Sequence, residues 1–316
     1  FPQYGKLARL DPEQLKSGER VAQDEYGKEE GRDFALWKGY KLEDGEVYWE
    51  SPWGKGRPGW HIECSAMSTH YLGDHFDIHC GGVDNIFPHH ENEIAQSCAA
   101  SGKEFVNYWL HNEHLLVENQ KMSKSLDNFY TLRDLVDKKC SPAAIRYTLI
   151  STHYRSKLNF TFKKVDESQK CINKLCELKR RFALIKEDND SMDNGVSIDE
   201  MLAGFSEKLG DDLNISGALG ELFSWVNGMF SRLDRDEVNY EVSQKAIIAL
   251  DKVDQVLGVM KKGEYEADDE IQRLIEQRDE ARIQKKWDAA DIIRKKLDAL
   301  NIVLEDTPEG TIWKKK

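Results

Sequence analysis

The sequence predicts an α/β region followed by an all-α region. Between residues 60 and about 150, short apolar runs alternate with helical stretches, and the run HFDIHCGG ends in glycines, which indicates a sheet with its loops at one edge. After about residue 162, apolar residues recur at helical spacing, which predicts a group of helices. Acidic breaks at 187–196 and 261–269 interrupt this helical part, and NIVLEDTPEGTIW predicts a small hairpin near the end.

The composition narrows the class of protein. A chain of 316 residues with 40% hydrophobic and 32% charged residues has room for two or three domains. No apolar run approaches the roughly 18 to 20 residues of a membrane span, so we expect no membrane partner. A net charge of −12 argues against general attraction to nucleic acid, although a local basic face remains possible. The six cysteines form no CxxC pair, which favours a reducing, cytoplasmic compartment.

The run GGVDNIFPHHENEIAQ combines histidines and glutamates at the start of a predicted helix. Pro88 suits the first helical position, and good helix formers continue to Gly102. His89 and Glu93 are four residues apart and therefore share one helix face. An imidazole and a carboxylate placed this way either hold a metal ion or form an ordinary surface pair. Cys64, on an earlier segment, is either a third ligand or a buried thiol.

The pentapeptide KMSKS at 121–125 is the strongest chemical signal. Two lysines three residues apart flank small hydroxyl residues, and mobile ammonium groups stabilise the charge that builds on a triphosphate attacked at its α-phosphate. An isolated K-x-x-K is more often a solvated basic turn.

KMSKS resembles the second signature of class I aminoacyl-tRNA synthetases, and the surrounding motifs narrow the resemblance. The chain is similar to the cysteinyl-tRNA synthetase family over essentially its whole length. The runs that carry this likeness are GRPGWHIECSAMS, HFDIHCGGVDNIFPHHENEIAQ, KMSKSLDNF, DDLNISGAL and KKWDAADIIRKKLDALNIVLEDTPEGTIW. The resemblance implies ATP-dependent activation of cysteine to cysteinyl-adenylate, followed by transfer to the 3′ end of tRNA(Cys). The implied partners are L-cysteine, ATP with Mg²⁺, and tRNA(Cys), and we expect a monomer.

The resemblance also implies a domain order. Residues 1–59 correspond to the end of a connective region and an ordered loop. Residues 60–162 correspond to the second half of a Rossmann-type catalytic domain with the KMSKS loop. Residues 163–264 correspond to a helical anticodon-binding bundle, and residues 265–316 to a small C-terminal domain that contacts tRNA.

The family implies a zinc ion held by Cys64, His89 and Glu93. Zinc prefers a thiolate to the harder oxygen of serine, so direct binding of the substrate sulfur would select cysteine. An apolar pocket alone rejects a near-isostere by only about 10²-fold. His90 faces another side of the helix, and we interpret it as a supporting or nucleotide-side group rather than a ligand.

Further site residues follow from the same resemblance. Lys121 and Lys124 are the expected catalytic residues, with Lys124 the first choice. The expected ATP-binding residues are Lys124, Gly81, Gly82, Asp84, Met122, Ser123 and Ser125. Trp60 and His79 are expected to line the amino-acid pocket, although a core tryptophan is the plainer interpretation of Trp60.

The stretch 281–300 is locally basic, with six Lys and Arg residues against three Asp, and such an excess suits tRNA phosphates. Tryptophans in this region either stack on exposed bases or belong to the core. The expected tRNA contacts are Lys285, Lys286, Trp287, Arg294 and Trp313.

Part of the family pattern has no counterpart in this chain. A complete member has an earlier Rossmann half with a HIGH-type phosphate motif and a further zinc-ligating cysteine, but no H-x-G-H occurs here and no cysteine precedes Cys64. We therefore expect the chain to be the C-terminal part of a longer protein, or the missing half to be a separate chain, and we expect the chain alone to be inactive. Two other functions remain open: a mycothiol-type ligase that joins cysteine to an amino sugar, and a non-catalytic tRNA-binding fragment. The long helical region 163–316 argues against the amino-sugar ligase.

Overall fold

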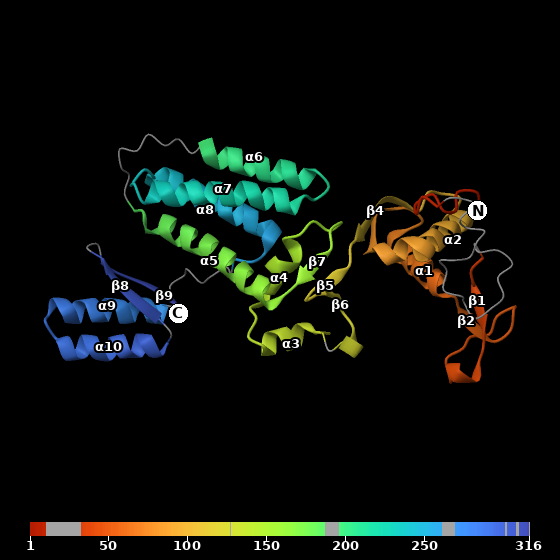
Figure 1. The fold of residues 1–316 in the computed structure, drawn as a ribbon, viewed down its shortest axis with the longest axis horizontal. Helices are drawn as coiled ribbons and strands as arrows, with labels where there is room; N and C mark the ends of the chain where they lie inside the picture. The colour runs from red at the N-terminus through yellow and green to blue at the C-terminus, as the bar shows by residue number, and fades with distance from the viewer. Residues whose placement is uncertain are drawn as a thin grey trace. The chain divides into compact units, whose positions relative to one another are not determined.

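The computed structural model describes residues 1–10, 33–126, 128–186, 196–260, 269–300, 302–307 and 310–315 (Figure 1). The chain divides into two units. The first contains residues 1–135, 148–164 and 211–216, and the second contains residues 136–147, 165–210 and 217–316. The two acidic breaks predicted from the sequence, at 187–196 and 261–269, lie almost entirely outside the described residues.

A parallel β-α-β arrangement forms the centre of the first unit. Strand β3 (Phe76–Gly82) pairs in parallel with β4 (Val106–Asn112), and α2 (Glu91–Ser101) lies between them in the chain. The register places His79 beside Trp109 and Gly81 beside His111. The strand predicted from HFDIHCGG and the α/β class are therefore confirmed.

Helix α2 ends as the sequence predicts, but it begins at Glu91, three residues after the predicted start at Pro88. Phe87 is extended (φ −136°, ψ 131°), so the helical turn that leads into α2 starts at Pro88. At the other end, Gly102 has φ 71° and donates its N–H to the carbonyl of Cys98 at 2.9 Å. A left-handed residue in this position is the ordinary stop signal of a helix.

Two short sheets flank this arrangement in the sequence. Strands β1 (Trp37–Gly39) and β2 (Gly56–Pro58) are antiparallel and precede α1 (Trp60–Leu72). Strand β5 (Leu115–Val117) pairs with β6 (Gln120–Lys121) and with β7 (Leu158–Phe160).

The segment YWLHNEHLLVE, predicted as one strand or a hairpin, contains residues of both β4 and β5. The hairpin alternative is wrong because β4 pairs with β3, whereas β5 pairs with β6 and β7. Helices α3 (Leu132–Asp137) and α4 (Pro142–Ile150) follow β6.

Four long helices form the bundle seen in green and cyan in Figure 1: α5 (Phe162–Leu184), α6 (Val196–Gly210), α7 (Ile215–Leu233) and α8 (Tyr240–Leu257). Their apolar residues recur at helical spacing and are buried, as Leu175, Leu178 and Phe182 show on α5. The predicted group of helices is confirmed.

The C-terminal segment has an apolar cluster of its own. Helices α9 (Asp269–Ile283) and α10 (Trp287–Ala299) precede an antiparallel hairpin of β8 (Ile302–Thr307) and β9 (Gly310–Lys315). The buried members of the cluster are Ile271, Leu274, Ile275, Leu297 and Ile302. The two helices and the hairpin predicted here are confirmed. Among the described helices, none is both long enough and apolar enough to cross a membrane.

Candidate active site

Helix α1 starts directly beside the segment that precedes β1. The N–H of Gly59 donates to the carbonyl of Leu36 at 2.8 Å, and a Cβ atom at position 59 would collide with the carbonyl oxygen of Ala35. Glycine is therefore required for this close approach. The first turns of α1 then present Trp60, His61 and Cys64 in sequence.

Glu93 is the buried acidic group of the site. Its side chain is only 4% exposed, and its Oε2 lies 3.4 Å from Nε2 of His79 without a hydrogen-bond partner among the described residues. Burial raises the pKa of Glu93 to about 7, although the thiol of Cys64 opposes this shift by hydrogen bonding to the carboxylate. Burial and the carboxylate in turn raise the pKa of Cys64.

His79 and His90 both lie near the carboxylate of Glu93. Ligand atoms of His79, His90 and Glu93 all lie within 4.8 Å of one another. Burial, with smaller contributions from neighbouring histidines, lowers the pKa of His79 and lowers that of His90 to about 3. Both imidazoles are thus neutral at physiological pH, which is the form that ligates metals.

Aromatic and imidazole rings hold these histidines in place. His79 stacks on Trp109 with ring centroids 4.6 Å apart, and Nδ1 of His90 lies 2.8 Å from Nε2 of His111. A Cβ atom at Gly81 would lie 2.6 Å from Cε1 of His90, so the glycine makes room for this imidazole. Gly81, at the end of β3, is therefore a position where the backbone and the imidazole of His90 pack closely.

His89 lies with a different group of rings. Its Nδ1 is 3.3 Å from Nδ1 of His61, and its ring centroid is 4.8 Å from that of Trp60. Of the three predicted zinc ligands, Cys64 and Glu93 are therefore neighbours, whereas His89 packs against residues of α1. The thiol, imidazole and carboxylate donors suit zinc, and the unpartnered Oε2 of Glu93 is a buried acceptor that a cation would satisfy.

The KMSKS segment starts at the end of a strand and continues into a short helical turn. Lys121 is the last residue of β6 and is exposed, and Lys124 begins the turn Lys124–Leu126. The hydroxyls of Ser123 and Ser125 lie 3.1 Å apart. Asn128 accepts the N–H of Ser123 at 2.8 Å and donates to the carbonyl of Lys121 at 3.2 Å. The side chain of Lys124 lies outside the described residues.

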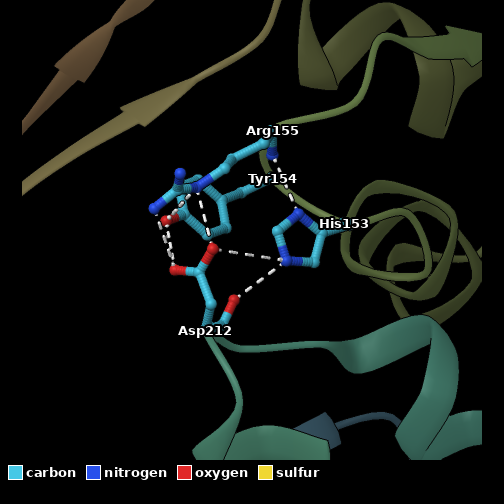
Figure 2. Close-up of polar contacts among 4 residues, drawn as sticks. All are labelled: His153, Tyr154, Arg155 and Asp212. Atoms are coloured by element: carbon cyan, nitrogen blue, oxygen red, sulfur yellow. Dashed lines mark hydrogen bonds and ion pairs between the residues drawn. The ribbon is translucent and has the colours of Figure 1, made fainter.

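A polar cluster in the first unit connects two distant segments (Figure 2). The carboxylate of Asp212 accepts the hydroxyl of Tyr154 at 2.6 Å and an N–H of Arg155 Nη2 at 3.2 Å, and its Oδ2 forms an ion pair with Nε of Arg155 at 2.8 Å. The backbone carbonyl of Asp212 lies 2.9 Å from Nε2 of His153. The hydrogen bond from Tyr154 and the charge of Arg155 hold the pKa of Asp212 below its usual value. The carbonyl of Tyr154 also accepts the N–H of Glu113, just after β4.

Several residues make contacts that the sequence did not predict. Asn128 and Asp212 lie within the motifs KMSKSLDNF and DDLNISGAL, but these motifs gave no sign of their hydrogen bonds. His61 and His111 had no sequence signal beyond their residue type, because their contacts with His89 and His90 join segments more than 20 residues apart.

The predicted tRNA contacts are divided between the surface and the core. Lys285, Lys286, Trp287 and Arg294 are exposed, and the side chain of Trp287 is 60% exposed. Trp313 instead is partly buried and packs against the apolar cluster of the C-terminal segment. The structure thus leaves Trp287 accessible to a base and gives Trp313 the core position that the sequence left as its alternative.

Comparison with known proteins identifies the family. Residues 1–170 match the model of the tRNA synthetases class I (C) catalytic domain, and residues 265–313 match that of the cysteinyl-tRNA ligase anticodon binding domain. The chain is 50% identical to a cysteine–tRNA ligase of Brachyspira hyodysenteriae, with coverage of 100% of this chain and 69% of the relative. Similar enzymes of Protochlamydia amoebophila and Chlamydia abortus are 46% and 45% identical, and the chain again covers 67% of each.

A solved structure supports the fold. The chain resembles the LeuRS in a ternary LeuRS–tRNA–LeuAMS complex from Agrobacterium radiobacter K84, with a TM-score of 0.50 and 14% identity over 71% of this chain and 34% of that one. The motifs, the site and the matched regions agree, and the chain belongs to the cysteine–tRNA ligase family of class I tRNA synthetases.

Proposed function

We propose that this chain is part of a cysteine–tRNA ligase that joins cysteine and ATP into cysteinyl-adenylate and pyrophosphate, and then transfers the cysteinyl group to the 3′ end of tRNA(Cys). The observation that carries the proposal is the pairing of Cys64 with the buried, incompletely satisfied carboxylate of Glu93. The match of 100% of this chain to 69% of a cysteine–tRNA ligase supports the same assignment.

In this proposal Cys64, His89 and Glu93 hold a zinc ion in the amino-acid pocket. Bound zinc supplies a preference for the thiolate of cysteine over the hydroxyl of serine. Glu93 gives the pocket a carboxylate in a poorly solvated place, where its attraction for a cation is stronger than at the surface. Trp60, with its ring against His89, forms one wall of the pocket.

Lys121 and Lys124 act on the triphosphate of ATP. Their ammonium groups stabilise the negative charge that develops during attack at the α-phosphate. Asn128 bonds to the backbone on both sides of Met122 and so orders the loop that carries them. Gly81, Gly82 and Asp84 are proposed to receive the adenosine. Magnesium is expected to accompany ATP as part of the substrate.

The C-terminal segment is proposed to bind tRNA through Lys285, Lys286, Trp287 and Arg294. The match of residues 265–313 to an anticodon-binding domain favours this role and argues against the amino-sugar ligase, which needs no such domain. The same match, together with the catalytic-domain match, favours a ligase over a non-catalytic fragment. A monomer in the cytoplasm is proposed as the working form.

The proposal is tested by cysteine-dependent ATP–pyrophosphate exchange in the complete enzyme, with serine as the control amino acid. We expect exchange with cysteine, at most traces with serine, and charging of tRNA(Cys). Exchange that responds equally to both amino acids, or cysteine activation without tRNA charging, contradicts it.

A further inference from the structure

Aromatic side chains are concentrated on the loop between β1 and β2. We call residues 40–55 the aromatic loop. Within it, Trp53 is 78% exposed, Trp49 is 54% exposed and Tyr48 is 40% exposed. Large rings in water are unfavourable, so a group of them on one short loop marks a binding surface.

The backbone of the aromatic loop is fixed by hydrogen bonds. Trp49 and Gly56 exchange two backbone hydrogen bonds, of 2.8 and 3.0 Å. The hydroxyl of Ser51 donates to the carbonyl of Gly54 at 2.7 Å and accepts the N–H of Trp53 at 3.1 Å. The two tryptophans therefore sit on a closed turn, which reduces the entropy lost when a ligand binds.

Neighbouring rings and a lysine support the exposed surface. The ring of Trp53 lies 6.3 Å from that of Trp37, tilted by 47°. Nζ of Lys55 lies 4.5 Å from the centroid of Tyr48 and forms an exposed ion pair with Glu50 at 3.6 Å, which a phosphate would have to replace. A flat ring beside an ammonium group suits a nucleobase and its phosphate.

The charge of the segment favours unpaired bases over a duplex. Residues 38–57 contain four basic and four acidic side chains, namely Lys38, Lys41, Lys55 and Arg57 against Glu43, Asp44, Glu46 and Glu50. Binding to a duplex backbone depends on an excess of positive charge. Stacking on single-stranded bases depends mainly on exposed aromatic rings, which the aromatic loop has.

The aromatic loop is joined directly to the candidate active site. Strand β2 ends at Pro58, Gly59 follows, and Trp60 begins α1 with its ring 4.8 Å from that of His89. An acyl acceptor must reach the activated amino acid at this site, and the acceptor in the proposed reaction is the 3′ end of a tRNA, whose last nucleotides are unpaired.

We propose that Trp49 and Trp53 stack on the unpaired nucleotides at the 3′ end of tRNA and hold that end during acyl transfer. This inference rests on the proposed function. It assigns the aromatic loop to the transfer step and gives it no part in the formation of the adenylate.

The first test measures the two half-reactions of the complete enzyme separately. Trp53→Ala should leave cysteine-dependent ATP–pyrophosphate exchange within about twofold of wild type, and slow single-turnover transfer of cysteine to tRNA by roughly five- to 150-fold, the range expected for loss of one base–aromatic stack. Trp53→Phe, which keeps a flat ring, should restore most of the rate. Leu42→Ala is the matched control, because Leu42 is 91% exposed on the same loop and has no ring.

The second test compares intact tRNA with tRNA that lacks its unpaired 3′ nucleotides. Wild-type enzyme should bind the shortened tRNA more weakly, and this difference should become smaller in Trp53→Ala, because one of the two proposed stacks on the 3′ nucleotides is then missing in both tRNAs. An undiminished difference, or an equal loss of transfer in Leu42→Ala, overturns the inference. Loss of pyrophosphate exchange in Trp53→Ala also overturns it, since the loop would then be a packing surface for another part of the protein. If wild-type enzyme fails to activate cysteine, the proposed function itself fails.

Discussion

Oε2 of Glu93 lies 3.4 Å from Nε2 of His79, yet it accepts no hydrogen bond among the described residues. A carboxylate oxygen in so buried a position is costly unless a donor or a cation satisfies it. Buried polar atoms without a hydrogen-bond partner are common at ligand-binding sites. The nearby thiol of Cys64 supplies a second ligand atom of the kind that zinc binds.

Replacement of Cys64 by serine, or of Glu93 by glutamine, should lower zinc affinity by about a hundredfold or more and reduce cysteine activation in parallel. Zinc content by mass spectrometry and cysteine-dependent pyrophosphate exchange measure the two effects. Cys98→Ser, a change of another half-buried cysteine on α2, is the matched control and should alter neither. Stoichiometric zinc with normal cysteine affinity in Cys64→Ser would exclude Cys64 as a ligand.

Lys124→Ala should slow adenylate formation by about a hundredfold and change cysteine affinity little, because in the proposed mechanism the lysine acts on charge that appears in the transition state. Single-turnover adenylation and equilibrium binding of cysteine separate the two quantities. Lys157→Ala removes an exposed lysine outside the KMSKS segment and serves as the control. A normal adenylation rate in Lys124→Ala would remove this lysine from the mechanism.

Asn128→Ala should slow adenylate formation by roughly tenfold through loss of two hydrogen bonds that order the KMSKS loop. The stability of the protein should change little, since the side chain touches only this loop in the bonds described. Adenylation kinetics and thermal unfolding provide the two measurements. Asn107→Ala, which removes an exposed amide bonded to Asp77, is the control. If Asn128→Ala and Asn107→Ala behave alike, the positioning role of Asn128 is wrong.

Asp212→Asn should loosen the contact between residues 151–155 and 211–216 in a pH-dependent way. The native pKa of Asp212 is lowered by Tyr154 and Arg155, so its stabilising effect is present above the ordinary aspartate pKa near 3.8 and is lost as the pH falls below it. At pH 7 we expect backbone amide protection in these segments to fall roughly two- to fivefold in the variant. At about pH 3 the difference between the variant and wild type should be smaller than at pH 7.

Hydrogen–deuterium exchange, corrected for intrinsic rates, measures this difference at both pH values. Asp77→Asn, which changes an exposed aspartate on β3, controls for general charge effects. A difference between Asp212→Asn and wild type that persists unchanged at pH 3 would show that the charge of Asp212 is not responsible.

Trp287→Ala and Trp313→Ala should affect different properties of the protein. Trp287 is exposed, so its loss should weaken tRNA binding about fivefold or more with little change in stability. Trp313 packs against the apolar cluster, so its loss should destabilise the C-terminal segment by about 1–3 kcal/mol. Filter binding of tRNA(Cys) and thermal unfolding distinguish the two, and equal effects of both changes on both quantities would contradict this division of roles.

The elements that the sequence predicted well are those set by local chemistry. Strand β3 follows from its β-forming residues and closing glycines, and the end of α2 follows from Gly102, whereas α2 itself starts at Glu91, after the turn that contains Pro88. The KMSKS segment is recognisable because the pentapeptide is specific by itself.

The features that the sequence did not predict depend on contacts between distant residues. Nothing near Leu115 shows that β5 pairs with β7, some 40 residues later, instead of with β4. The contact between His90 and His111 likewise depends on the parallel register of β3 and β4. Trp287 and Trp313 look alike in a sequence, and only the packing of the C-terminal cluster separates an exposed ring from a buried one.

Glu91 precedes Glu93 by two residues, is equally buried, and is fully engaged with the backbone. Its two carboxylate oxygens accept the N–H groups of Gly5 and Ala8, each at 2.8 Å. Trimming the first ten residues during protein production would therefore remove both hydrogen-bond donors from this buried acid, two residues before Glu93 on the same helix. A shortened protein would carry an uncompensated buried acid beside a proposed metal ligand in the sequence, and weak metal retention in it would reflect the position of the cut and not the quality of the native pocket.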